Sequence, residues 1–193
     1  MANQYFENLL NVAFPNEVRL QNLDPADIQN FTADFQGKVT LIGNVTGKAD
    51  FFNGKLTGLS KARRHGDCFG PFNHESKSYH CIVSFDDLHI TYDGKMNYDK
   101  MPKVDFKAKA NITSTQVLVE VEQNPNQMPN LKKMVFYNIG QLKIKFTGLG
   151  PLNRFADFLE TEFNLHYQVK IFKSMNQILL FTFGRAVSRV SLP

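Results

Sequence analysis

Apolar and polar residues alternate along most of the middle of this sequence. The cleanest example is VDFKAKANI, residues 104–112, in which every second residue is apolar. The same alternation occurs in residues 39–45, 79–85, 88–92, 117–122 and 142–146. Half-buried strands with this pattern belong to an antiparallel sheet with one face in water. No helical segments separate these strands, which argues against a parallel α/β fold. We also expect Asp93-Gly94 to form a tight hairpin turn.

The two ends of the chain follow a helical period instead. Residues 4–13 carry apolar side chains at helical spacing, and Gly150-Pro151 precedes a long run with the same spacing. The apolar direction of that run rotates near residues 165–169, so the helix either kinks there or curves. We therefore predict an α+β fold in which a long, strongly curved antiparallel sheet wraps around a long C-terminal helix, with a short N-terminal helix. The expected organisation is one domain, residues 1–193, made of a helical segment (1–22), the sheet (33–148) and the C-terminal helix (150–191).

The composition narrows the class of protein. The chain has 18 Phe and 6 Tyr but no Trp, which indicates an interior that uses apolar bulk with few polar groups. A net charge of +4 does not demand a nucleic-acid partner. No apolar run is long enough to span a membrane. The first ten residues do not have the layout of a signal peptide, which fits either a cytosolic protein or a mature secreted form with an added initiator Met.

Both cysteines lie in HGDCFGPFNHESKSYHC, residues 65–81. A loop with Gly and Pro separates Cys68 from Cys81, and a hairpin would bring them to disulfide distance. Zinc ligation by these cysteines and nearby histidines is less favoured, because neither the C-x2-4-C nor the H-x3-5-H spacing is present. Free thiols are the remaining alternative. We predict a disulfide and no metal site.

Nothing in the sequence predicts catalysis. Nucleophile elbows, phosphate-binding glycine loops and histidine pairs at metal spacing are absent. The acidic pairs Asp86-Asp87 and Glu120/Glu122 have no adjacent base or nucleophile, and the latter pair is better explained by solubility. We expect a protein that is not an enzyme and needs no cofactor.

The order of the elements resembles a known family. LDPADIQNFTADFQGKVTLIGNVTG, a hairpin-rich middle and GQLKIKFTGLGPLNRFADFLETEFNLHYQVKIFKSMNQILLFTF together look like the group 7 mite allergens. These belong to the tubular lipid-binding superfamily, with the bactericidal/permeability-increasing protein and the takeout and juvenile-hormone-binding proteins. The resemblance implies a secreted arthropod protein without catalytic activity, and relatives occur in the saliva of ticks. Takeout-type proteins carry their disulfide near the N-terminus, whereas both cysteines here lie in mid-chain, so their ligand pocket is not transferred.

The resemblance also implies an apolar ligand held between the sheet and the helix. The residues expected to line that site are Val104, Phe106, Ala108, Ile144 and Phe146 on the sheet, and Phe155, Leu159, Phe163, Ile171 and Met175 on the helix. The alternative is that the same side chains pack together and leave no room.

Two surface features complete the expectations. Asn30, Asn44 and Asn111 each begin an Asn-x-Thr glycosylation sequon, which supports secretion. Lys61, Arg63 and Arg64 form a basic surface. We therefore weigh two functions: a lipid carrier, and a salivary interaction protein that acts through its surface on host coagulation or complement proteins and impairs haemostasis. Either would act as a monomer or weak dimer, with a lipid, a plasma protein or an anionic surface as partner.

Overall fold

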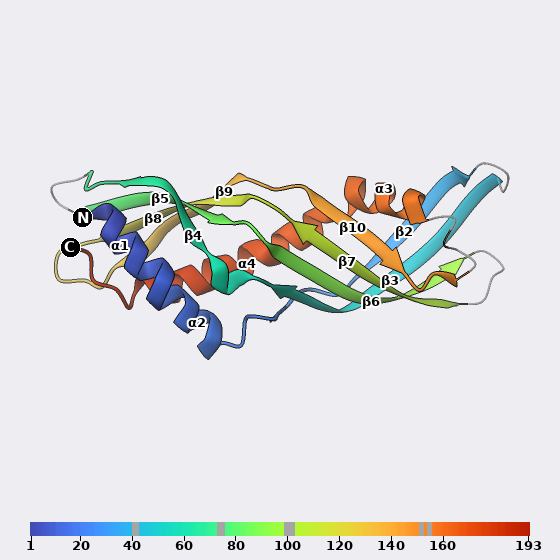
Figure 1. Ribbon diagram of the computed structural model, residues 1–193, viewed down its shortest axis with the longest axis horizontal. Helices are drawn as coiled ribbons and strands as arrows, with labels where there is room; N and C mark the ends of the chain where they lie inside the picture. Colours follow the sequence, from blue (N-terminus) through green and yellow to red (C-terminus); the bar gives the residue numbers. More distant parts are fainter. Residues whose placement is uncertain (40–42, 73–75, 99–102, 151–152, 154–155) are drawn as a thin grey trace.

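The computed structural model of the protein describes residues 1–39, 43–72, 76–98, 103–150, 153 and 156–193. Helical segments occupy both ends of the chain, and the strands lie between them (Figure 1). The N-terminal helical elements are α1 (Ala2–Asn8), the π-helical η1 (Leu9–Ala13) and α2 (Phe14–Leu20). The C-terminal helices are α3 (Ala156–His166) and α4 (Gln168–Val187), and a short 3-10 helix, η2, spans Leu59–Lys61.

The strands form two antiparallel sheets. The six-stranded sheet contains β1 (Ala26–Asp27), β2 (Phe31–Val39), β3 (Gly43–Thr57), β6 (Leu88–Tyr98), β7 (Val104–Ile112) and β10 (Leu142–Thr147), in the order β1-β3-β6-β7-β10 with β2 also paired to β3. The four-stranded sheet has the order β4-β5-β8-β9, from β4 (Arg63–Phe69), β5 (Lys77–Phe85), β8 (Thr115–Gln123) and β9 (Asn130–Asn138). The α+β class and the antiparallel sheet are thus confirmed.

The same runs of chain build both sheets, which we expected to be one. β5 is followed by β6 after two residues, and β7 by β8 after two residues, so long strands cross from one sheet to the other (Figure 1). Ser114, between β7 and β8, has a positive φ of 59°. Gly140, between β9 and β10, fits against this crossing so closely that a Cβ there would lie 1.6 Å from the Thr113 carbonyl oxygen. At this junction the strands leave their neighbours in one sheet and pair with neighbours in the other.

The expected turn at Asp93-Gly94 is wrong, because both residues lie inside β6. Gly94 is the register partner of Phe106 on β7. A Cβ on Gly94 would lie 2.1 Å from the Phe106 ring, so the ring occupies the space that a side chain would need. Glycine is required here for close packing rather than for a turn.

The C-terminal helix kinks rather than curves. α3 ends at His166 and α4 begins at Gln168, with Tyr167 between them at φ −115° and ψ −16°. Both helices lie along the sheets (Figure 1). In the described chain, no helix is both long and apolar enough to cross a membrane.

The N-terminal helix packs on α4 at one end of the molecule. The ring of Phe14 lies 4.4 Å from that of Phe183, centroid to centroid. Beside them the carboxylate of Glu17 is fully buried and forms ion pairs with Arg189 and, at 3.1 Å, with Arg185. Both guanidinium side chains remain about half exposed, so this buried charge is compensated from the solvent side.

Candidate functional site

The predicted ligand-lining residues of α3 face those of β10 in the six-stranded sheet, whereas α4, which carries Ile171 and Met175, packs against β9 of the four-stranded sheet. Eight of the ten are buried, Val104 is half-buried, and Phe155 lies outside the described residues. The eight buried residues are Phe106 and Ala108 of β7, Ile144 and Phe146 of β10, Leu159 and Phe163 of α3, and Ile171 and Met175 of α4. The alternation of β7 and β10 explains this placement, because every second residue faces the helices.

Aromatic rings from the sheet and the helix meet in this interior. We call Phe31, Phe51, Tyr92, Phe106, Phe146, Phe163 and Tyr167 the aromatic cluster. The Phe51 ring lies 5.2 Å from Phe106 and 5.5 Å from Phe163, between centroids. Phe106 and Phe146 are 5.6 Å apart in an edge-to-face arrangement. Such pairs stabilise one another beyond the area they bury.

Four members of the cluster, Phe31, Phe51, Tyr92 and Tyr167, were not among the predicted lining residues. Phe31 stacks on Phe51 at 4.6 Å. The alternation of β6 places Tyr92 on the inner face, and its hydroxyl donates a hydrogen bond to the Gln29 carbonyl oxygen at 3.0 Å. Burial raises the pKa of this hydroxyl, which therefore stays a donor. The double phenylalanine Phe51-Phe52 gave no alternating signal that separates the inward from the outward ring.

The kink joins the helices to the edge strand β2. The Tyr167 hydroxyl donates to the Asp34 carbonyl oxygen at 2.7 Å and accepts from the Asp34 N–H at 2.8 Å. The next turn adds Lys170, whose ammonium lies 5.3 Å from the Phe31 ring centroid and donates to the Thr32 carbonyl oxygen at 3.4 Å. One side of the interior is thus closed by polar contacts to backbone groups that an edge strand leaves unpaired.

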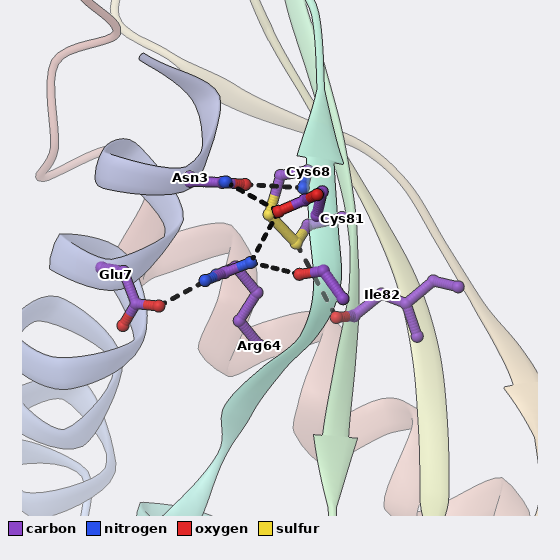
Figure 2. Close-up of a disulfide and its surroundings, with 8 residues drawn as sticks. Asn3, Glu7, Arg64, Cys68, Cys81 and Ile82 are labelled. Carbon is purple, nitrogen blue, oxygen red and sulfur yellow. Dashed lines mark hydrogen bonds and ion pairs between the residues drawn. A yellow bond between two sulfur atoms is a disulfide. The ribbon is translucent and has the colours of Figure 1, made fainter.

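The predicted disulfide is confirmed. Cys68 of β4 and Cys81 of β5 are bonded, with their Cα atoms 4.5 Å apart (Figure 2). The Cys68 N–H donates to Asn3 Oδ1 at 2.7 Å, and Asn3 Nδ2 donates to Asp67 at 3.0 Å. Since both sulfur atoms are oxidised in the disulfide, they cannot bind zinc as thiolates.

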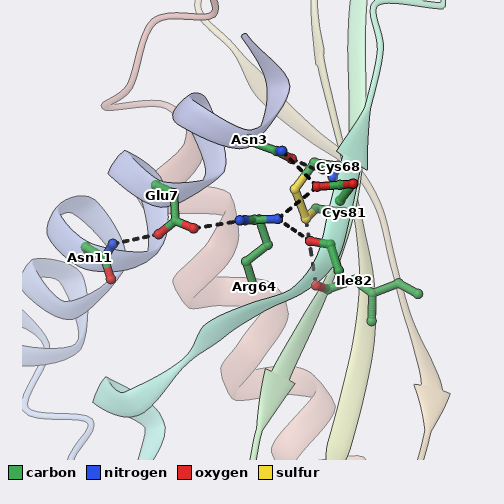
Figure 3. A network of polar contacts seen from close by, with 9 residues as sticks. Asn3, Glu7, Asn11, Arg64, Cys68, Cys81 and Ile82 are labelled. Carbon is green, nitrogen blue, oxygen red and sulfur yellow. Dashed lines mark hydrogen bonds and ion pairs between the residues drawn. A yellow bond between two sulfur atoms is a disulfide. The ribbon is translucent and has the colours of Figure 1, made fainter.

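Arg64 continues this network onto the N-terminal helix. Its Nε donates to Glu7 at 2.9 Å, and its Nη1 donates to the Gly66 carbonyl oxygen and lies 3.5 Å from Asp67 (Figure 3). Asn11 donates to the second Glu7 oxygen at 2.9 Å. The hydrogen bond from Arg64 lowers the pKa of the Glu7 carboxyl below its usual range. The disulfide and these contacts together hold α1 against β4.

The predicted basic surface carries carboxylates as well. Lys61 pairs with Asp87 at 3.6 Å, and Arg63 pairs with Asp86. Arg64, only a quarter exposed, belongs to the network with Glu7. The acidic pair Asp86-Asp87 is therefore occupied by salt bridges, and Glu120 and Glu122 likewise share Lys132 at 3.1 and 3.2 Å.

The three sequon asparagines are exposed. Asn30 precedes β2, Asn44 lies near the start of β3, and Asn111 lies on the outer face of β7. Asn111 Oδ1 is 2.8 Å from Nδ1 of His89. Among the residues that the structure describes, no three His, Cys, Asp or Glu side chains gather closely enough to hold a metal ion.

Comparison with known proteins adds a family and a fold. A family model described as group 7 allergen matches residues 1–178. The crystal structure of lipopolysaccharide binding protein is similar with a TM-score of 0.60 and 14% identity, over 97% of this chain and 38% of that one. Takeout 1 from Epiphyas postvittana is similar with a TM-score of 0.53 and 13% identity, over 95% of this chain and 91% of that one. No curated protein sequence matches the chain. At these identities the two structures establish the fold.

Proposed function

Because the chain belongs to the group 7 allergen family, we propose that it binds a lipid-like apolar molecule between its six-stranded sheet and its C-terminal helices, without catalysis. The aromatic cluster carries this proposal. Its phenylalanine rings offer apolar surface from both the sheet and the helix, and they need no polar partner. The shared fold with a protein named for binding lipopolysaccharide supports the same reading.

The proposed ligand lies along the predicted lining residues, to which we add Phe51. The Phe51 ring packs against both Phe106 and Phe163, so an acyl chain must displace these rings to enter. Each buried methylene of such a chain gains about 0.8 kcal/mol, and Met175 can change its shape around the chain. Entry between α3 and the edge strand β2 requires the contact of Tyr167 with Asp34 to open.

We further propose that the protein is secreted. A disulfide between Cys68 and Cys81 persists in an oxidising compartment, and the exposed Asn30, Asn44 and Asn111 fit glycosylation there. A place in arthropod saliva, with an effect on haemostasis, stays a prediction from the resemblance. The surface-mediated alternative has less support, because Lys61, Arg63 and Arg64 are all paired with carboxylates.

Native mass spectrometry of the protein secreted from insect cells tests the proposal. A reproducible apolar adduct, identified by organic extraction and lipid analysis, is the expected result. A ligand-free mass that persists after incubation with a lipid mixture would show that the cluster is a filled core, and the proposal would be abandoned.

Two matched substitutions then locate the ligand. Phe163→Leu alters the aromatic cluster, whereas Phe183→Leu makes the same change at a fully buried ring beside Phe14. Both should reduce stability to a similar extent. Only Phe163→Leu should change the affinity for a dansyl-labelled fatty acid, by about fivefold or more, equivalent to about 1 kcal/mol. Equal effects of the two variants on affinity would place the ligand elsewhere.

A further inference from the structure

A pocket of about 420 Å³ is lined mainly by outward-facing residues of the six-stranded sheet, and Phe106 of the aromatic cluster also lines it. Its volume falls in the range of small-molecule sites. One wall is a row of outward residues in register across four strands: Phe52, Asp93, Lys107 and Thr147. The half-buried ring of Phe52 lies where the register of β3 shifts, and such a bulge bends the strand.

The next row on the same face carries a lysine and an aspartate opposite each other. Lys95 of β6 and Asp105 of β7 are register partners and both line the pocket. Oppositely charged residues in this relation usually attract each other across the strands. In the described parts of the chain, however, neither side chain forms an ion pair or a side-chain hydrogen bond.

In the neighbouring row, the charges of Asp93 and Lys107 already have partners. Asp93 accepts a hydrogen bond from Asn53 at 3.2 Å and lies 3.8 Å from the Lys107 ammonium. The pocket therefore offers one uncommitted cation, one uncommitted anion and an aromatic ring. A ligand that matches all three has an ammonium, an anionic oxygen and apolar groups next to the ammonium.

We propose that this pocket binds a zwitterionic phosphocholine group. Lys95 receives the phosphate oxygens, while Asp105 and the face of Phe52 receive the quaternary ammonium. The Cβ atoms of register partners on antiparallel strands lie about 5 Å apart. This spacing suits a ligand whose two opposite charges are joined by a two-carbon linker. The groups that would hold the ligand, Lys95, Asp105 and Phe52, lie on the outer face of the sheet, so the proposal does not rest on the interior site, although Phe106 lines both.

Titration of the protein with phosphocholine, followed by backbone amide NMR, tests this assignment. Saturable shifts should appear at residues 93–95, 105–107 and 147–148. Lys95→Gln should weaken binding about tenfold or more. Asp105→Asn should also weaken it, by at least about threefold, because the ammonium loses its partner. Lys145→Gln is the matched control. Lys145 is exposed on the same sheet face, is the register partner of Lys109, and does not line the pocket.

Asp105→Asn separates a zwitterion site from a simple anion site. Inorganic phosphate should bind Asp105→Asn no more weakly than the unchanged protein, because removal of a negative charge favours an anion. If phosphocholine also binds Asp105→Asn more tightly, or if Lys145→Gln weakens it as much as Lys95→Gln, the proposal is wrong. Absence of saturable shifts overturns it as well.

Vesicles identify the source of the ligand. Flotation with phosphatidylcholine vesicles, reversed by soluble phosphocholine and reduced in Lys95→Gln, assigns the pocket to lipid headgroups in a membrane. Saturable binding of soluble phosphocholine without flotation assigns it to free phosphocholine compounds.

Discussion

His89 is the residue whose charge depends most directly on its neighbours. Its Nδ1 lies 2.8 Å from Asn111 Oδ1 and its Nε2 lies 3.0 Å from Asp87 Oδ1. Since both neighbours are acceptors, the two nitrogens donate together only when the ring is protonated. The hydrogen bond to Asn111, and then the contact with Asp87, raise the pKa of His89 above its ordinary value. The resulting stabilisation is complete below about pH 6.5 and is lost as pH rises through the folded-state pKa.

Replacement of Asn111 by Val should lower the pKa of His89, because the largest of these contacts is removed. The shift is measured by NMR titration of the imidazole ring. The Asn97→Val variant changes an exposed asparagine on β6 without touching a histidine and should leave the titration unchanged. A His89 pKa that does not fall in Asn111→Val would contradict the assigned contact.

Substitution by alanine should have opposite effects on stability at two glycines, Gly94 and Gly184. Gly94→Ala forces a methyl group into the Phe106 ring, which the aromatic cluster holds in place, and should cost about 1–3 kcal/mol. Gly184 lies inside α4 with nothing within 4 Å of its missing Cβ, so Gly184→Ala should stabilise the protein by about 0.5–1 kcal/mol. Urea unfolding of both variants measures the difference, and equal signs would refute the packing argument.

At the level of secondary-structure elements, Tyr167 joins the kink between α3 and α4 to β2 through two hydrogen bonds. Tyr167→Phe keeps the ring in the aromatic cluster but removes both hydrogen bonds to Asp34, and should cost about 0.5–1.5 kcal/mol. Hydrogen exchange provides the specific readout: the Asp34 amide should lose protection, while amides in the middle of β7 keep theirs. The control is Tyr137→Phe, at a ring that is 67% exposed. An unchanged Asp34 amide would mean that α3 is held to β2 by packing alone.

For the whole molecule, alternation predicted which residues face the interior, but not how the strands are divided between sheets. The pattern in residues 104–112 identifies the buried side of β7, because burial follows the two-residue period. The division into two sheets depends on a positive φ at Ser114 and on the contact of Gly140 with Thr113, which no local pattern encodes. The turn that we predicted at Gly94 was wrong for the same reason: glycine is needed there because of the Phe106 ring on the neighbouring strand β7. Likewise, the outer pocket depends on cross-strand register that a single strand does not show.

The two ends of the molecule are held by different means, so they should lose structure separately. The Cys68–Cys81 disulfide and the Arg64 network lie around α1, β4 and β5, whereas the aromatic cluster joins β3, β7 and β10 to α3. Replacement of both cysteines by alanine should cost about 2–3 kcal/mol, because the disulfide closes a short loop.

Hydrogen exchange of the Cys68→Ala/Cys81→Ala protein shows where that loss falls. Amides of α1, β4 and β5 should exchange faster, since the Cys68 N–H that binds Asn3 is no longer held in place. Amides of β7 and β10 should remain protected, and affinity for the dansyl-labelled fatty acid should change less than twofold. The Arg64→Gln variant serves as the comparison, because it weakens the same end without removing the disulfide. A uniform loss of protection in either variant would instead show that both ends unfold as one cooperative unit.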